Sequence, residues 1–253
     1  MNNYELLILY KLFMETNNGQ SAALSLTNEQ LQVILTGKFG DGCLSTPKTC
    51  KDNSIYSSNC KYEEYVDFKM KLLGNLASSK SFLKENGFSK KPIWQFHTHV
   101  NSDITKIKNM SIEESLKLMN ELGLALWFYD DGSLHKTKLF YNLNTQSFPK
   151  EVNEDLFIPF LKNFGINAKS TIERKKDGRE FWYLRVGKYD GAYEISSILS
   201  KYPVSCYHYK VWSPETIQIW SKLQEELKRT NNLDCSTRKK AIIFKKLEEQ
   251  DSL

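Results

Sequence analysis

Two Asp-Gly pairs, each at the end of an apolar run, place carboxylates where they could bind a metal ion. Asp41 precedes Gly42 in "VILTGKFGDG", and Asp131 precedes Gly132 in "LWFYDDGSL", where Asp130 adds a neighbouring acid. Carboxylates that meet repel one another, and protonation or a divalent cation relieves the repulsion. Mg²⁺ suits a site with few protein ligands, because it retains waters and binds substrate phosphates. Two acids that bridge such ions can promote in-line attack of water on a phosphodiester.

A simpler interpretation is that each Asp-Gly pair only ends a helix in a turn. The two pairs, however, lie in matching surroundings. Asp41 and Asp131 are 90 residues apart (131 minus 41), and Gly74 and Gly165, which end the next amphipathic segments, are 91 apart (165 minus 74). The strand-like stretches "PIWQFHTHV" and "EFWYLRV" follow these glycines. Agreement across several elements favours an internal repeat, and therefore a pseudo-dimer within one chain.

The helices that would position the two acids have matching start signals. Residues 27–30 (Thr-Asn-Glu-Gln) and 111–114 (Ser-Ile-Glu-Glu) are capping boxes. The apolar spacing after them predicts a helix that stops near residues 40–42 and a single helix over 111–131. If the two helices are related by a two-fold axis and end side by side, the two acids lie close together.

Composition is that of a folded protein. The 253 residues, of which 40% are hydrophobic, suffice for one large or two ordinary domains. No stretch of about 18 apolar residues occurs, so we expect no membrane span. Residues 1–18 are expected to form an amphipathic helix rather than a signal peptide. With 35 Lys+Arg against 30 Asp+Glu, the net charge of +5 weakly favours a polyanionic partner.

The five cysteines have no CxxC spacing, which favours a reducing, intracellular compartment over a disulfide framework. A zinc site built from Cys43, Cys50 and Cys60 would need further ligands at finger spacing. Richness in Lys, Asn and Ser hints at an A+T-rich genome, so an organelle (mitochondrion or chloroplast) and a bacterial cytoplasm both stay open as locations.

The two helices also resemble a known family. "VILTGKFGDG" and "LGLALWFYDDG" are similar to the two signature helices of LAGLIDADG homing endonucleases, in the single-chain branch with two motifs. "YNLNTQSFPKEV" and "HYKVW" resemble the second half of the yeast mitochondrial intron-encoded type. The resemblance spans residues 5–225. It implies an α+β fold with a pseudo-two-fold pair of αββαββα half-domains, each with a saddle-shaped antiparallel sheet.

From the resemblance we expect half-domains at residues 1–105 and 106–230, with 231–253 as a tail or peripheral helix. The small apolar island at residues 241–244 would dock that helix.

The resemblance also implies functional residues. The acid that precedes each terminal glycine is catalytic and binds metal, which assigns Asp41 and Asp131. A basic residue near each scissile phosphate corresponds to Lys108 and Lys210, although either could equally be an ordinary surface lysine. Asp130 is expected to support the helix end rather than to contact metal.

Two positions depart from the family pattern. Lys38 stands in the apolar run of the first motif, so we expect it to reach solvent or a carboxylate. Pro159 is expected to kink or shorten its helix, because proline lacks the N–H that the helix needs.

The strands of each half should present alternate side chains to the major groove. Asp177-Gly178 is a strong hairpin turn signal within the basic stretch 170–186. An ordinary solvated strand face is the alternative for each polar residue, and His97 with His99 could be metal ligands in another fold. The candidate DNA contacts are Ser45, Lys48, Lys51, Asn53, Tyr56, Ser58, Asn59, Lys61, His97, His99, Asn101, His135, Lys136, Lys138, Asn142, Asn144, Gln146, Arg174, Lys175, Lys176 and Arg179.

The expected function is that of a monomeric, site-specific double-strand DNA endonuclease, a hydrolase that uses Mg²⁺ or Mn²⁺ on a long asymmetric target. The resemblance implies cleavage across the minor groove, short 3′ extensions and a role in intron mobility. Two alternatives stay open: a maturase that binds host intron RNA on the same fold, and a DNA-binding protein without catalytic activity.

Overall fold

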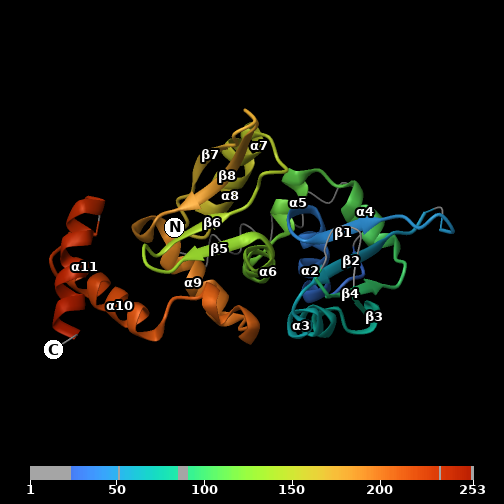
Figure 1. Ribbon diagram of the computed structural model, residues 1–253, viewed down its shortest axis with the longest axis horizontal. Helices are drawn as coiled ribbons and strands as arrows, with labels where there is room; N and C mark the ends of the chain where they lie inside the picture. The colour runs from blue at the N-terminus through green and yellow to red at the C-terminus, as the bar shows by residue number, and fades with distance from the viewer. Residues whose placement is uncertain (1–23, 51, 85–90, 234, 252–253) are drawn as a thin grey trace, which may run out of the picture.

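The computed structural model describes residues 24–50, 52–84, 91–233 and 235–251, and Figure 1 shows their arrangement. Lys51 and the helix expected at residues 1–18 lie outside the described residues. None of the described helices is both long enough and apolar enough to cross a membrane.

The first repeat forms a four-stranded antiparallel sheet with the strand order β1-β2-β4-β3. Its helix α2 starts at the expected capping box, in which Thr27 and Gln30 exchange hydrogen bonds. In chain order the elements are α2 (Asn28–Phe39), β1 (Gly42–Ser45), β2 (Ile55–Cys60), α3 (Glu63–Leu73), η1 (Gly74–Leu76), β3 (Ala77–Leu83), β4 (Ile93–Thr98) and α4 (Ser102–Asn109).

The second repeat forms a sheet of the same topology, β5-β6-β8-β7. Its elements are α6 (Glu121–Asp131), β5 (Gly132–His135), β6 (Phe140–Leu143), α7 (Lys150–Val152), η2 (Asn153–Phe157), α8 (Ile158–Lys162), β7 (Lys169–Arg174), β8 (Glu180–Val186), η3 (Lys188–Ala192), α9 (Tyr193–Lys201) and η4 (Ser205–Lys210). The predicted α+β pair of half-domains is therefore confirmed.

Strand register relates the two halves residue by residue. Leu44 of β1 pairs with Tyr56 of β2, and Leu134 of β5 pairs with Tyr141 of β6. Both tyrosines are buried beneath their sheets. Each sheet therefore has an inner face against helices and an opposite face, which we call the outer face.

The single helix expected over 111–131 is wrong, because the structure has two helices there. α5 (Ile112–Leu118) starts at the predicted capping box, and the chain is extended at Met119 before α6 begins. Gln32 of α2 explains the break: its side chain accepts a hydrogen bond from Asn120 N at 2.9 Å and donates to Leu118 O at 3.0 Å. These bonds across the interface replace those of a continuous helix, and the Asn120 side chain then caps α6.

The helix around Pro159 is interrupted, as expected. The π-helical turn η2 joins α7 to α8, and Pro159 stands in the first turn of α8. The hairpin prediction is also confirmed, since Gly178 adopts φ +84° in the turn between β7 and β8. This positive φ is costly for residues with a Cβ.

The predicted boundary at residue 105 falls inside α4, and the division of the chain at that residue stays a prediction. After the second half-domain come α10 (Pro214–Arg229) and α11 (Thr237–Asp251), which lie at the end of the molecule farthest from the first half-domain (Figure 1). Phe244 of α11 is buried, with its ring 6.2 Å from that of Trp220 in α10. The apolar island thus docks the terminal helix through Phe244.

Candidate active site

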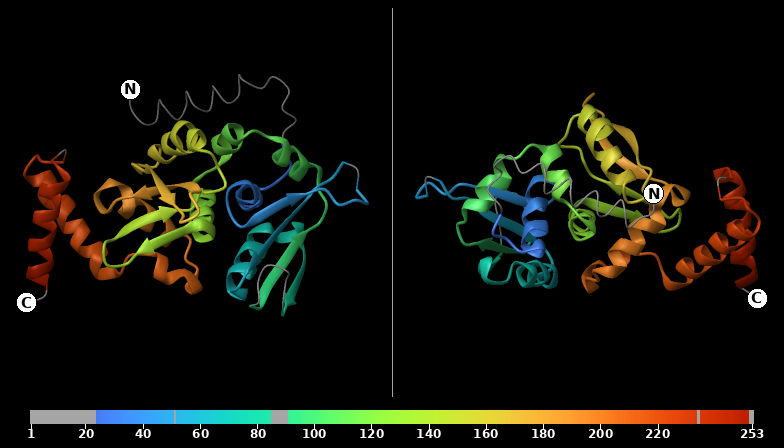
Figure 2. Two further views of the ribbon diagram at one scale, coloured as in Figure 1. Left: turned by 45° about the horizontal axis from the view of Figure 1, so that its top comes forward. Right: turned by 180° about the vertical axis from the view of Figure 1, so that it is seen from behind.

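The two motif helices, α2 and α6, lie side by side at the centre of the molecule in Figures 1 and 2. Asp131 is the last residue of α6, and Asp41 stands between the cap residue Gly40 and the first residue of β1. Each acid is therefore held where a helix passes directly into the first strand of its sheet. Within the described part of the chain, no side chain or backbone N–H donates a hydrogen bond to the carboxylate of either residue.

The two carboxylates interact electrostatically. Burial raises the pKa of Asp131 to about 7, and the negative charges of Asp41 and Asp130 add to that rise. Burial and the charge of Asp130 likewise raise the pKa of Asp41. Lys69 and Lys210 oppose both shifts. The charge of Asp41 thus acts on Asp131, and the surroundings of the two acids carry a surplus of negative charge.

Asp130 is bound by protein groups and leaves no free carboxylate for a metal ion. Lys69 Nζ, from α3 of the other half-domain, lies 2.8 and 2.9 Å from its two oxygens, and Tyr65 donates a hydrogen bond at 2.8 Å. Both partners of the ion pair have side chains only 1% exposed. Burial lowers the pKa of Lys69, but the charge of Asp130 outweighs this and holds that pKa above its usual range.

Gly40 makes room for this ion pair. A methyl group there would lie 2.6 Å from Asp130 Oδ2, closer than carbon and oxygen can approach. The two motifs therefore differ at the equivalent position, where one has glycine and the other an acid that crosses the interface. We did not predict Lys69, although the sequence carries a sign of it: Tyr65, Lys69 and Leu73 share one helical stripe, so the lysine stands in an apolar row.

The two lysines predicted near the scissile phosphates have different environments. Lys210 is buried and donates to Tyr129 O at 2.5 Å and Phe128 O at 3.3 Å, at the end of α6. Burial lowers its pKa to about 8, against the pull of the nearby aspartates. Lys108 is exposed at the end of α4 and donates to Thr46 Oγ1 at 2.8 Å, and it is not among the causes of the pKa shift of Asp41 or Asp131.

Lys38 is partly exposed to solvent, but its ammonium contacts backbone carbonyl oxygens rather than a carboxylate, which refines our expectation. Its ammonium donates to the carbonyl oxygens of Ile107, at 3.1 Å, and of Met110, where α4 ends. A cation at this position interacts favourably with the unpaired carbonyls of a helix C-terminus. Lys38 thereby ties the first motif helix to α4.

The donor set fits a divalent cation such as Mg²⁺. Asp41 and Asp131 offer hard carboxylate oxygens without hydrogen-bond donors among the described residues, and a cation would offset the repulsion that raises their pKa values. The described residues contain no group of three or more His, Cys, Asp or Glu side chains suited to metal binding. Cys43, Cys50 and Cys60 therefore do not form such a group there. A cation at the two aspartates would need water and substrate phosphates as further ligands.

The outer faces of the sheets carry part of the predicted DNA contacts. Side chains at strand positions on these faces are Ser45, Asn59, His97, His135 and Asn142. Residues in adjoining loops and turns are Lys48, Asn53, Lys61, His99, Lys136, Lys138, Asn144 and Gln146. All of these are at least partly exposed, and their contact with DNA stays a prediction.

Two of the predicted contacts, Tyr56 and Ser58, are wrong, whereas Asn101 is partly exposed and its contact with DNA stays a prediction beside its role in the fold. Tyr56 and Ser58 are on the inner face, 0% and 4% exposed, and both accept hydrogen bonds from buried Lys69. Asn101 caps α4 by accepting a hydrogen bond from Asp103 N at 2.7 Å. The phase of β2 explains the first two: Ser57 and Asn59 face outward, so their neighbours must face inward.

The basic hairpin between β7 and β8 is partly neutralised. Arg174 pairs with Glu180, Lys175 with Glu173, and Arg179 with Asp177, while Lys176 stands exposed at the tip. Exposed pairs of this kind contribute about 0–1 kcal/mol, so a phosphate can displace the acid.

Several outer-face residues were missed from the sequence. Ser57 and Gln95 project from the first sheet, and Tyr183 and Arg185 from the second. The alternation of "PIWQFHTHV" could have indicated Gln95, because Trp94 and Phe96 flank it. Arg185 was hidden because "EFWYLRV" is mostly apolar.

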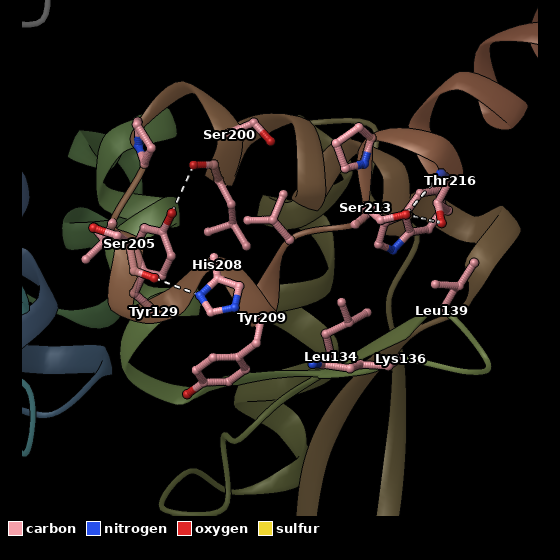
Figure 3. Close-up of a pocket in the computed structure, with 16 residues that line it drawn as sticks. Tyr129, Leu134, Lys136, Leu139, Ser200, Ser205, His208, Tyr209, Ser213 and Thr216 are labelled. Atoms are coloured by element: carbon pink, nitrogen blue, oxygen red, sulfur yellow. Dashed lines mark hydrogen bonds between the residues drawn. The ribbon is translucent and has the colours of Figure 1, made fainter.

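A separate pocket of about 810 Å³ lies beside η4 (Figure 3). His208 and Tyr209 line it from η4, and Leu134 and Leu139 from β5 and the turn that follows. Its lining is mainly apolar, and neither catalytic aspartate takes part in it.

The raised pKa of Asp131 predicts that Asp131→Asn stabilises the metal-free protein at high pH. The folded protein binds the proton more tightly than the unfolded chain, whose aspartates titrate near 3.8, so ionisation costs stability progressively between pH 4 and 7. At pH 8 in EDTA we expect the free energy of unfolding of the variant to exceed that of the wild type by about 2–4 kcal/mol.

Urea denaturation at pH 4, 6 and 8 checks this prediction. The gain should be absent at pH 4, complete at pH 8 and reduced by saturating Mg²⁺. A variant no more stable than the wild type at pH 8 contradicts it.

The sequence comparisons agree with this geometry. Residues 32–191 match the LAGLIDADG DNA endonuclease family. The protein RecA of Mycobacterium leprae is 31% identical over 119 residues, which cover 43% of this chain and 16% of that protein. A probable intron-encoded DNA endonuclease 3 of Mycosarcoma maydis is 31% identical over 84 residues, 33% of this chain and 61% of that protein. The chain thus matches less than two thirds of the length of these relatives.

Among solved structures, the homing endonuclease I-WcaI bound to its DNA recognition sequence has the same fold. The TM-score is 0.61 at 19% identity, and the match covers 79% of this chain and 97% of that chain. The family match extends over more than half of the 253 residues and includes Asp41, Asp131 and both sheets. The chain therefore belongs to the LAGLIDADG DNA endonuclease family.

Proposed function

We propose that this protein is a site-specific endonuclease that cuts both strands of DNA with a divalent cation held by Asp41 and Asp131. The observation that carries the proposal is the placement of these two carboxylates at the ends of the paired helices α2 and α6, where the charge of Asp41 raises the pKa of Asp131 and no described protein group donates a hydrogen bond to either carboxylate. A bound Mg²⁺ or Mn²⁺ would supply activated water and charge neutralisation at the phosphate.

The residues around the aspartates have supporting tasks in this proposal. Lys210 fixes the end of α6 through two carbonyl oxygens and adds a positive charge beneath the aspartates. Lys108 is exposed beside Thr46, which follows β1, and would contact a backbone phosphate there. The Lys69–Asp130 pair keeps the third acid away from the cation.

We also propose that the partner is a long, asymmetric duplex, as the two outer faces differ in their side chains. The relative I-WcaI is described bound to its DNA recognition sequence, which supports the same kind of partner here. A single chain carries both halves, so a monomer suffices. We further propose a role in intron mobility and an intracellular location, organellar or bacterial.

A cleavage selection tests the function and needs no defined target sequence. Plasmids that carry a randomised duplex segment are incubated with purified protein and Mg²⁺ or Mn²⁺, and linear products are sequenced. We expect linearised plasmids with one common target and no product in EDTA. Binding without cutting in either metal would overturn the proposal and favour a DNA-binding protein; binding of intron RNA alone would favour a maturase.

A further inference from the structure

Two side-chain pairs occupy equivalent places on the outer faces of the two sheets. In the first sheet Ser57 of β2 lies opposite His97 of β4. In the second sheet Asn142 of β6 lies opposite Arg185 of β8. The strand pairings that align Tyr56 with Tyr141 make Ser57 equivalent to Asn142 and His97 equivalent to Arg185. On DNA bound as proposed, the two pairs would therefore stand at equivalent places in the two halves of the target.

Arg185 is held in a fixed orientation by its neighbours. Its Nε donates to Asn142 Oδ1 at 3.0 Å, and one terminal nitrogen donates to the Tyr183 hydroxyl at 2.8 Å. Its guanidinium lies over the ring of Phe140, 4.7 Å from the centroid. Stacking and two hydrogen bonds restrict the plane of the guanidinium before any ligand binds.

The charge of Arg185 is not neutralised by an acid. Arg174 and Arg179 in the nearby hairpin pair with Glu180 and Asp177, whereas none of the ion pairs among the described residues includes Arg185. Its side chain is exposed on the face where DNA is proposed to bind. A pre-oriented, unpaired guanidinium is suited to a rigid planar acceptor.

The first sheet offers different chemistry at the equivalent place. His97 has one ring nitrogen, Nδ1, buried without a hydrogen-bond partner among the described residues, and Ser57 offers a single hydroxyl. Neither can present two parallel N–H donors in one plane. The adjacent pair Asn59 and Gln95 carries neutral amides instead of charge.

In the major groove a guanine presents O6 and N7 as two acceptors in one plane, which an arginine fork matches. We propose that Arg185, oriented by Asn142, Tyr183 and Phe140, recognises a guanine in the second half of the target, and that the symmetric position in the first half, facing Ser57 and His97, has no such requirement. This inference rests on the proposed DNA-binding function. It adds to that function the identity of one base that the second half-domain recognises.

Sequence preference measured with the full chain tests the inference. A library of randomised duplex DNA is selected for binding in Ca²⁺ and, separately, for cleavage in Mg²⁺, with wild type, Arg185→Ala and Arg229→Ala. Arg229 is exposed on α10 and paired with Glu226, so its variant controls for the loss of one arginine charge. We expect the preference of the protein for one guanine in the second half-site to fall about 5- to 100-fold in Arg185→Ala. The same preference should be unchanged in Arg229→Ala.

A transfer experiment sharpens the test. The double variant Ser57→Asn/His97→Arg should gain a guanine preference at the symmetric position of the first half-site. If Arg185→Ala instead weakens all sequences equally and lowers the salt dependence of binding, Arg185 is a phosphate contact and the inference is wrong. Because the bound sequences are scored separately, a protein that binds selectively but cuts nothing would refute the proposed nuclease and still decide the role of Arg185.

Discussion

Asp131→Asn is expected to reduce double-strand cleavage by on the order of 10³-fold or more, because a metal-binding carboxylate stabilises the transition state by several kcal/mol and each 1.4 kcal/mol is a factor of ten. DNA binding should persist, since the outer faces of the sheets are unchanged. The single-turnover rate on a plasmid that carries the selected target measures the loss, and gel-shift titration measures the binding. The same substitution is expected to stabilise the metal-free fold, so loss of activity would not reflect unfolding.

Asp155→Asn is the matched control, because Asp155 is exposed on η2 and no charge of the site depends on it. Its cleavage rate should equal that of the wild type. If Asp131→Asn keeps more than a tenth of the wild-type rate, Asp131 does not bind the catalytic metal. Asp41→Asn should give the same result as Asp131→Asn, because the two acids serve one shared centre.

Lys69→Met is expected to destabilise the protein by about 3–5 kcal/mol, since it leaves Asp130 buried without its counter-ion. At about 2–4 °C per kcal/mol for a chain of this size, the melting temperature should fall by about 6–20 °C. Thermal unfolding at pH 8 measures the loss. Lys71→Met, an exposed position two residues further along α3, should change the free energy of unfolding by less than about 0.5 kcal/mol.

The double variant Lys69→Met/Asp130→Asn completes the test. A neutral amide at residue 130 can still accept the hydrogen bond of Tyr65, so most of the lost stability should return. If Lys69→Met costs no more than Lys71→Met, or if the second substitution restores nothing, the ion pair does not hold the half-domains together.

The positions of Asp41 and Asp131 at the ends of the motif helices followed from the sequence because they depend on local rules. Capping boxes fix where α2 and α5 begin, and the spacing of apolar residues leads each motif helix to its Asp-Gly end. The repeat then implies that the two ends meet. None of these features depends on contacts between residues far apart in the sequence.

The phase of β2 could not be decided in the same way. In "SIYSSNC" serines stand at both odd and even positions, so alternation of polarity does not distinguish the faces. The burial of Tyr56 and Ser58 and their hydrogen bonds to Lys69 show which side is inward. A shift of one residue reverses every assignment on a strand, which is why Tyr56 and Ser58 were wrong together.

The remaining differences arise from contacts between the halves. Lys69 and Asp130 are 61 residues apart in sequence, and Gln32, which interrupts the second motif helix, is 88 residues from Asn120. Such pairs have no local sequence pattern. They depend on the complementarity of two unlike surfaces at the interface between the halves.

The close approach of Asp130 to Gly40 has a consequence for the pairing of two identical halves. Two copies of the second half alone would oppose Asp130 with its own duplicate, and alignment on Gly74 and Gly165 places Phe160, not a lysine, opposite each acid. Such a homodimer would bury two repelling anions with no cation between them. Each half therefore requires the other, unlike half to complete the Lys69–Asp130 pair.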